Sequence, residues 1–144
     1  MFNFLIGAAT AAHQVEGNNN HSDYWIMEHT KHTDYAEPSG DACDHHHRYA
    51  EDIKLLADAG CNAYRFSIEW ARIEPEGGKF VLAEIEHYRS VLKCCYDNGL
   101  TPIVTLHHFS SPAWLIGKGG WCDRRVIGYF ERYARYIAEN LGDM

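Results

Sequence analysis

Positive charge, proline and long apolar stretches are all scarce in this sequence of 144 residues. Only 13 Lys and Arg stand against 20 Asp and Glu, which gives a net charge of −7. Without a Lys/Arg cluster, this balance argues against nucleic acid or an anionic membrane as the main partner. No apolar run is long enough to predict a membrane-spanning helix. With 4 Pro and 46% apolar residues, the composition predicts a folded domain.

Cysteines are few and form no recognisable framework. There are 5, an odd number, and no C-x-x-C motif occurs. Neither a set of disulfides nor a zinc ribbon is predicted, and a reducing compartment, the cytoplasm, is the expected location. The apolar opening from Phe2 to Ala12 has no basic residue before it, because the first Lys is Lys31, so a secretory signal is not favoured.

Several motifs of enzyme chemistry are also missing. The sequence has no G-x-S-x-G, no P-loop, no H-E-x-x-H and no dinucleotide-binding glycine motif. The 10 His are densest in Asp44-His45-His46-His47. Because successive residues of a helix point about 100° apart, these rings cannot all face one ion. We predict no metal and no cofactor, with a metal-dependent hydrolase that uses the histidines as an alternative.

Hydrophobic periodicity predicts three strand–helix units. Short apolar runs typical of buried strands are each followed, after a polar loop, by apolar residues three and four apart. The expected strands are 4–9, 63–68 and 101–106, and the expected helices are 44–59, 83–98 and 123–141. Asp44 and Asp123 are the expected caps of the first and last helix. Residues 10–43 are expected to form a long irregular connection.

This order predicts an α/β fold with a parallel sheet. Long loops follow the strands and short turns follow the helices, which is the plan of a TIM (β/α)8 barrel. Eight units need about 250 residues or more, and only three are present. We therefore interpret residues 1–144 as the N-terminal part of a single TIM-barrel domain, an incomplete barrel that belongs to a larger enzyme.

The second predicted strand alternates two kinds of side chain. Tyr64, Phe66, Ile68 and Trp70 are expected to face the helices, and the intervening side chains to face the barrel interior. The second set includes Arg65, whose burial would require a carboxylate partner. That partner can serve packing alone or belong to an active site, and the strand pattern does not decide between them.

Polar and aromatic residues follow the first and third strands. His13 and Gln14 lie beyond the first strand, and His107 and His108 lie beyond the third. Neutral donors and acceptors at the mouth of a barrel suit a ligand rich in hydroxyl groups. The accompanying aromatic residues suit either the apolar faces of sugar rings or core packing; they are Trp25, Trp70, Phe109, Trp114 and Trp121.

Four stretches together resemble glycoside hydrolase family 1, the β-glucosidase family. They are residues 4–17, residues 44–52, residues 64–75, and residues 105–112 followed by 119–121. The resemblance implies a TIM barrel that hydrolyses terminal β-D-glycosides with retention, as a β-glucosidase does. It also implies a β-linked glucoside or related oligosaccharide as the partner.

The resemblance assigns roles to individual residues. Gln14 and His108 match family residues that bind hydroxyls of the sugar at the cleaved end. Phe109 stands where many members have Trp, and Arg65 matches the arginine that contacts the nucleophilic carboxylate. Trp121 matches a tryptophan of mainly structural role. Arg72 lies on the same segment as Arg65 but outside the predicted site.

The resemblance also exposes a departure from the family pattern. Family members carry the acid/base glutamate in an Asn-Glu-Pro motif, whereas Glu-Pro occurs here only at 37–38 and 74–75, preceded by Ala36 and Ile73. Both catalytic glutamates are therefore missing from these residues, and retaining hydrolysis needs two. The chain alone is predicted to be inactive. A non-catalytic sugar-binding or structural module of βα units is a further alternative.

Overall fold

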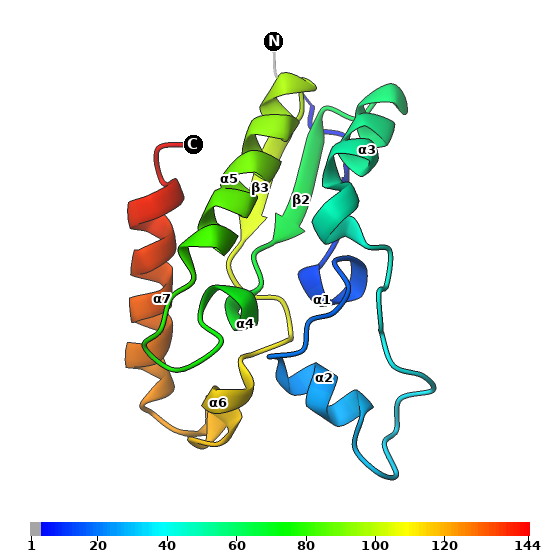
Figure 1. Ribbon diagram of the computed structural model, residues 1–144. Helices are drawn as coiled ribbons and strands as arrows, with labels where there is room; N and C mark the ends of the chain where they lie inside the picture. The colour runs from blue at the N-terminus through cyan, green and yellow to red at the C-terminus, as the bar shows by residue number, and fades with distance from the viewer. Residues whose placement is uncertain (1–3) are drawn as a thin grey trace.

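A computed structural model describes residues 4–144, so the first three residues, part of the apolar opening, lie outside the described range. Its centre is a parallel sheet of β1 (Gly7–Ala9), β2 (Ala63–Ser67) and β3 (Thr101–Thr105), in that spatial order. The register places Ala9 beside Arg65 and Arg65 beside Ile103. Figure 1 shows β2 and β3 running in one direction, with the polar loops gathered below their carboxyl ends.

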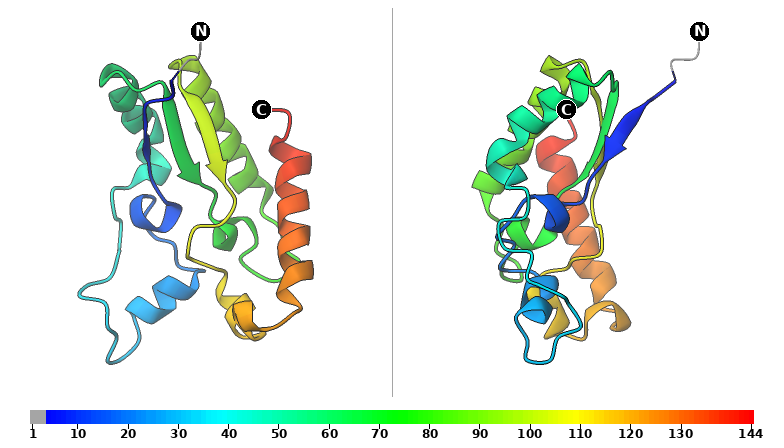
Figure 2. Two further views of the ribbon diagram at one scale, coloured as in Figure 1. Left: turned by 180° about the vertical axis from the view of Figure 1, so that it is seen from behind. Right: turned by 90° about the vertical axis from the view of Figure 1, so that its right-hand side faces the viewer.

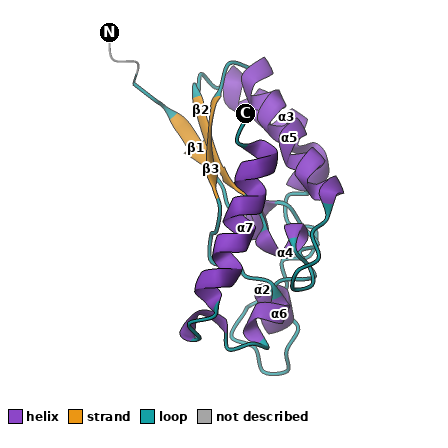
Figure 3. Cartoon of the chain, turned by 90° about the vertical axis from the view of Figure 1, so that its left-hand side faces the viewer, coloured by secondary structure: helices purple, strands orange, loops and turns teal. Residues whose placement is uncertain are grey.

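Three long helices follow the three strands. They are α3 (His45–Asp58), α5 (Leu82–Asp97) and α7 (Val126–Leu141). All three lie on one face of the sheet, as the side views in Figures 2 and 3 show. The βα order therefore agrees with the first units of a barrel, in which helices cover only the outer face of the strands.

Short helical turns interrupt the loops beyond the strands. They are α1 (Ala12–Val15), α2 (Asp23–Glu28), α4 (Trp70–Ile73), α6 (Ala113–Ile116) and the 3₁₀ turn η1 (Gly120–Cys122). The expectation of an irregular connection over residues 10–43 was thus wrong in part, since α1 and α2 lie there. Helices of one or two turns have too few periodic residues to be recognised in the sequence.

Element boundaries differ from the expected ones where polar side chains bind elsewhere. Asp123 does not begin α7: its Oδ1 accepts the backbone N–H of Arg125 at 2.8 Å, and the helix starts at Val126. Asp44 does precede α3, but its side chain caps no backbone N–H and Oδ1 lies 2.6 Å from Nδ1 of His47 instead. The expected strand over 4–9 is reduced to Gly7–Ala9.

The alternation along the second strand is confirmed. Tyr64, Phe66, Ile68 and Trp70 are each buried almost completely in the core between the sheet and the helices. Trp70 stacks on Tyr133 of α7, with ring centroids 4.9 Å apart. The same core cluster takes in Tyr88 of α5.

Gly7 allows β1 to lie close against β2. A Cβ at this position would come 2.1 Å from the backbone oxygen of Ala63, which no real side chain tolerates. The small residue at the end of the first apolar run is therefore required by the pairing of the strands.

A buried ion pair joins the loop after β1 to the loop after β2. Oε2 of Glu16 accepts Nε–H of Arg72 at 2.8 Å, and Oε1 accepts the hydroxyl proton of Tyr88 at 2.8 Å. The Arg72 guanidinium also donates to the backbone oxygen of Gly17. Burial raises the pKa of Glu16 although Arg72 and Tyr88 act to lower it. Arg72 therefore holds the two loops together. Its place outside the predicted site had suggested a residue without such a role.

We expect Arg72→Met to lower the free energy of unfolding by about 3 kcal/mol, because it leaves the Glu16 carboxylate buried without a counter-charge. Urea denaturation at pH 7 measures this. The double variant Glu16→Gln with Arg72→Met should recover part of the loss. Arg48→Met, which removes an exposed pair with Glu51, should leave stability nearly unchanged. Equal effects of Arg72→Met and Arg48→Met would contradict the account.

Candidate functional site

The loop after β3 forms a polar and aromatic hollow at the carboxyl end of the sheet. Its volume is about 460 Å³, and it is lined by His107, His108, Phe109 and Trp121. The rings of His108 and Phe109 meet edge to face, with centroids 4.8 Å apart. Phe109 is 68% exposed. An imidazole beside a free aromatic face suits a polyhydroxylated ligand.

Phe109 is held in a strained backbone conformation. Its φ is +63°, in the left-handed region that bulky residues rarely adopt. The N–H of Ser110 donates to the carbonyl oxygen of His108 at 2.9 Å, so Phe109 is the centre of a γ-turn. Such strain costs about 1–3 kcal/mol and persists only where surrounding contacts impose it.

Ser111 provides one of those contacts. Its backbone and Asp23 exchange two hydrogen bonds of 2.8 Å: the N–H of Asp23 donates to the carbonyl oxygen of Ser111, and the N–H of Ser111 donates to Oδ1 of Asp23. The Ser111 hydroxyl oxygen accepts Nε1–H of Trp121 at 2.9 Å and lies 3.2 Å from Nε2 of His107. Burial lowers the pKa of His107. His107 and Trp121 thus both contact the hydroxyl group of Ser111.

Glu69, which the sequence analysis did not single out, provides the second contact. The side chain is fully buried at the end of β2. Its Oε2 accepts the hydroxyl proton of Ser110 at 2.7 Å, and its Oε1 accepts the N–H of Ala71 at 3.1 Å. Burial raises the pKa of Glu69 to about 7. The signal in the sequence was a glutamate among apolar residues just beyond a predicted strand. That signal does not identify its partner, Ser110, which follows a different strand.

Gln14 and His13, neighbours in the sequence, have different environments. Gln14 is exposed on α1. His13 is buried: its Nε2 lies 2.8 Å from Oε1 of Glu28, and its Nδ1 lies 3.1 Å from Nδ2 of Asn19. The expectation that both residues open onto the mouth of the barrel was wrong for His13, because successive side chains of a helix point about 100° apart and only that of Gln14 faces outward.

Arg65 lies half-buried in the middle of β2, on the row that it shares with Ala9 and Ile103. Ile103 is 44% exposed, so this row belongs to the face that the helices leave open. Within residues 4–144 no acid forms an ion pair with Arg65, whereas Arg72 and Arg132 both have buried glutamate partners. A local packing pair, one of the two alternatives for Arg65, is not seen in the described part of the chain.

The histidines of α3 each bind a different acid. Nδ1 of His45 lies 2.7 Å from Asp52, Nε2 of His46 lies 3.1 Å from Glu84, and Nδ1 of His47 lies 2.6 Å from Asp44. Across residues 4–144, no three His, Cys, Asp or Glu side chains are placed to hold one metal ion.

The aromatic residues named in the sequence analysis have different environments. Trp70 is buried, and Trp114 donates its Nε1–H to the backbone oxygen of Glu74 at 2.8 Å. Trp25 stacks on His29, with centroids 4.5 Å apart. Phe109 and Trp121 are the aromatic residues that line the hollow.

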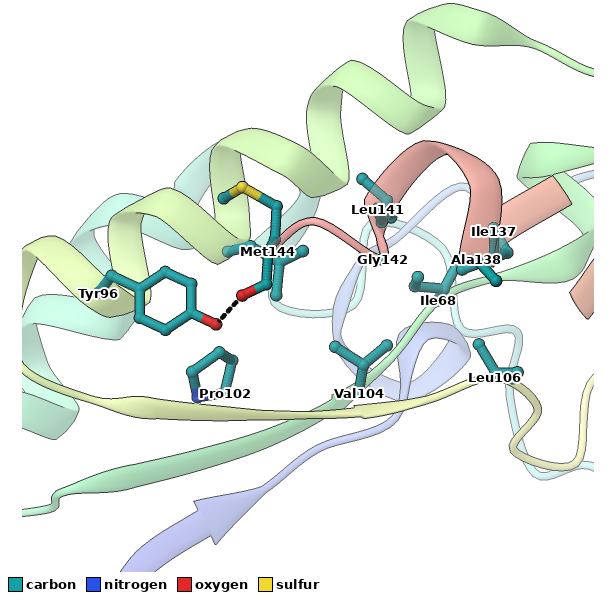
Figure 4. Close-up of a pocket in the computed structure, with 11 residues that line it drawn as sticks. Ile68, Tyr96, Pro102, Val104, Leu106, Ile137, Ala138, Leu141, Gly142 and Met144 are labelled. Carbon is teal, nitrogen blue, oxygen red and sulfur yellow. Dashed lines mark hydrogen bonds between the residues drawn. The ribbon is translucent and has the colours of Figure 1, made fainter. Parts of the chain in front are cut away.

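A second hollow lies between β3, α5 and α7 and has a different character. It encloses about 240 Å³, and Ile68, Val104, Leu106 and Leu141 line much of it, as Figure 4 shows. The hydrogen bond drawn there joins the hydroxyl of Tyr96 to the backbone oxygen of Met144. Because a binding site needs several convergent polar groups, this apolar hollow is not the candidate site.

Comparison with known proteins agrees with this geometry. The sequence profile of Glycosyl hydrolase family 1 matches residues 2–144. The chain belongs to glycosyl hydrolase family 1. It is 43% identical over 148 aligned positions to Beta-glucosidase A of Acetivibrio thermocellus, an alignment that covers 98% of this chain and 33% of that protein.

Solved structures of this family confirm the expected fold. A crystal structure of beta-glycosidase BGL167 matches with a TM-score of 0.96 and 57% identity, over 97% of this chain and 34% of that one. Beta-glucosidase from Thermotoga maritima in complex with deoxynojirimycin matches with a TM-score of 0.92 and 38% identity, over 97% of this chain and 34% of that one. The chain therefore spans about a third of these family members and forms part of a TIM barrel. Among residues 4–144, none of the helices combines the length and the apolar character that spanning a bilayer requires.

Glu69→Gln is expected to remove a pH dependence of stability. The carboxyl group titrates near 7 in the folded protein, against an ordinary value of 4.5, so the folded state holds the proton more tightly. Wild-type stability should therefore fall as pH rises from about 4.5 to about 7 and then level off. The free energy of unfolding of the Gln variant, relative to that of the wild type, should therefore rise by up to about 3 kcal/mol between pH 5 and pH 8.

Urea unfolding at several pH values measures the difference between the two proteins. Glu16, Arg72 and Tyr133 face Glu69 from neighbouring elements and are common to both, so the difference isolates Glu69. A difference that does not change between pH 5 and pH 8 would show that Glu69 is ionised throughout.

Proposed function

We propose that this chain is the N-terminal, sugar-binding part of a retaining β-glucosidase that hydrolyses terminal β-D-glycosides. The observation that carries the proposal is the set of residues at or beyond three adjacent parallel strands of a family 1 chain. Gln14 follows β1, Arg65 lies on β2, and His108 and Phe109 follow β3. In a TIM barrel the loops at this end of the strands build the active site.

Each of these side chains has a chemical role in the proposal. Gln14 and His108 exchange directional hydrogen bonds with the hydroxyls of the sugar at the cleaved end, and Phe109 packs against an apolar face of the ring. Arg65 places a positive charge on the open face of the sheet, where it favours the ionised form of a nucleophilic carboxylate. We propose no metal and no cofactor in this chemistry.

The two catalytic glutamates lie outside these 144 residues in this proposal. A retaining mechanism needs two carboxyl groups about 5 Å apart, one as nucleophile and one as acid and then base. The deoxynojirimycin complex of the Thermotoga maritima relative supports a glucose-like ligand for the site. Two further statements stay predictions: that residues 1–144 belong to a single barrel domain, and that the protein is cytoplasmic.

We expect a complete protein containing this chain to cleave a nitrophenyl β-glucoside, and residues 1–144 alone to give no turnover above the blank, because the carboxylate pair is missing. Proton NMR of the first-formed sugar should show the β-anomer. Activity of residues 1–144 that a substitution within them abolishes would contradict the proposal and favour a metal-dependent or other hydrolase. Sugar binding without cleavage by the complete protein would favour the non-catalytic module.

Arg65→Met in the complete enzyme should lower kcat at least about tenfold, equivalent to about 1.4 kcal/mol of transition-state stabilisation. The acidic limb of the pH–rate profile should move to higher pH, because the nucleophile loses the charge that keeps it ionised. The control is Arg135→Met, which removes an exposed pair with Glu131 on α7. An unchanged rate and an unchanged acidic limb in folded Arg65→Met would make Arg65 a packing residue.

A further inference from the structure

The γ-turn that presents Phe109 depends on contacts from outside its own loop. Phe109 has a φ of +63°, and its ring is largely exposed, so the ring itself contributes little burial that would hold the backbone in place. The residues on its C-terminal side, Ser110 and Ser111, are buried. The turn is therefore fixed by its buried serines and not by the residue at its centre.

The two serines bind different elements. Ser111 is joined to Asp23 and thus to α2, as described above. Ser110 is joined to Glu69 by a hydrogen bond of 2.7 Å between two buried side chains. Glu69 is the residue that immediately precedes α4, so this bond connects the end of β2 to the turn beyond β3.

Glu69 is itself held from three directions. Its Oε1 caps the first turn of α4 by accepting the N–H of Ala71 at 3.1 Å. Its backbone N–H donates to the hydroxyl oxygen of Tyr88 at 2.9 Å, and Tyr88 lies on α5. The remaining oxygen, Oε2, points to Ser110. A side chain with so little freedom gives Ser110 a fixed hydrogen-bond acceptor.

We infer that Glu69 is a positioning residue of the sugar site, which through Ser110 holds the γ-turn at Phe109 and so sets the placement of His108 and Phe109. This inference rests on the proposed function, and it adds a residue that does not touch the sugar. Glu69 acts by hydrogen-bond geometry. A neutral amide at this position retains that action, since Oε1 of Gln can accept from Ala71 while its amide donates to the Ser110 hydroxyl oxygen.

The test measures binding of deoxynojirimycin to the complete protein by calorimetry, together with the Tm of each variant. Ser110→Ala removes only the bond to Glu69 and leaves the cap of α4 in place. We expect it to raise the Kd of the iminosugar at least fivefold. Glu69→Leu, which removes both bonds, should raise the Kd at least as much, and Glu69→Gln should stay within about twofold of wild type.

Glu74→Gln is the matched control. Glu74 is another fully buried glutamate at the other end of α4, and its carboxylate binds Trp70, Gly78 and Arg132. The Glu74→Gln variant should have a lower Tm than the wild type and the same Kd for the iminosugar. Where Glu69→Leu does not fold, Ser110→Ala decides the matter.

The outcomes separate the inference from the function on which it rests. A wild-type protein that does not bind the iminosugar refutes the proposed function. Wild-type binding with an unchanged Kd in Ser110→Ala refutes the positioning role alone. If the Kd rises as much in Glu74→Gln as in Ser110→Ala, the effect is a general loss of stability and the positioning role is refuted. If the affinity of Glu69→Gln falls far below that of the wild type, the charge of Glu69 is needed and not its geometry.

Discussion

Buried and half-buried carboxylates at the carboxyl end of the sheet hold the loops of this protein together. Parallel strands cannot be joined by tight turns, so each is followed by a long polar segment whose backbone groups need partners. Glu16 binds Arg72 and Tyr88, Asp23 binds the backbone of Ser111, and Glu69 binds Ser110. Each acid belongs to one loop and binds another element, so the three loops form a single polar layer beneath the strands.

This layer makes the exposed site residues possible. Buried carboxylates are costly unless several donors satisfy them, and here both oxygens of Glu16 and both oxygens of Glu69 accept a hydrogen bond. The same donors fix the loops, which leaves Gln14 and Phe109 exposed on a rigid support and His108 partly exposed beside them. Strain at Phe109 can persist because the two residues that follow it, Ser110 and Ser111, are held by Glu69 and Asp23. A binding site on loops thereby acquires the rigidity usual for helices and strands.

Much of the fold could be predicted from the sequence because it follows from local pattern. The alternation from Tyr64 to Trp70 identified the face of β2 that packs on the helices, and the motifs around Gln14, Arg65 and His108 pointed to the family. The errors have a common cause. Asp123, which looked like a helix cap, binds Arg125 two residues later, and His13 turns toward Glu28. Each choice depends on a competing partner that the pattern does not reveal.

The sequence by itself determined the order of the three strands and the three long helices, the buried face of the second strand, and the family to which the chain belongs. These follow from periodicity and from motifs within short segments. Only the tertiary structure decided that Arg72 is a buried partner of Glu16, 56 positions away, and that Glu69 supports Ser110, 41 positions away. The physical reason is that the partner, the burial and hence the pKa of a polar side chain are set by elements that meet only when the chain is folded.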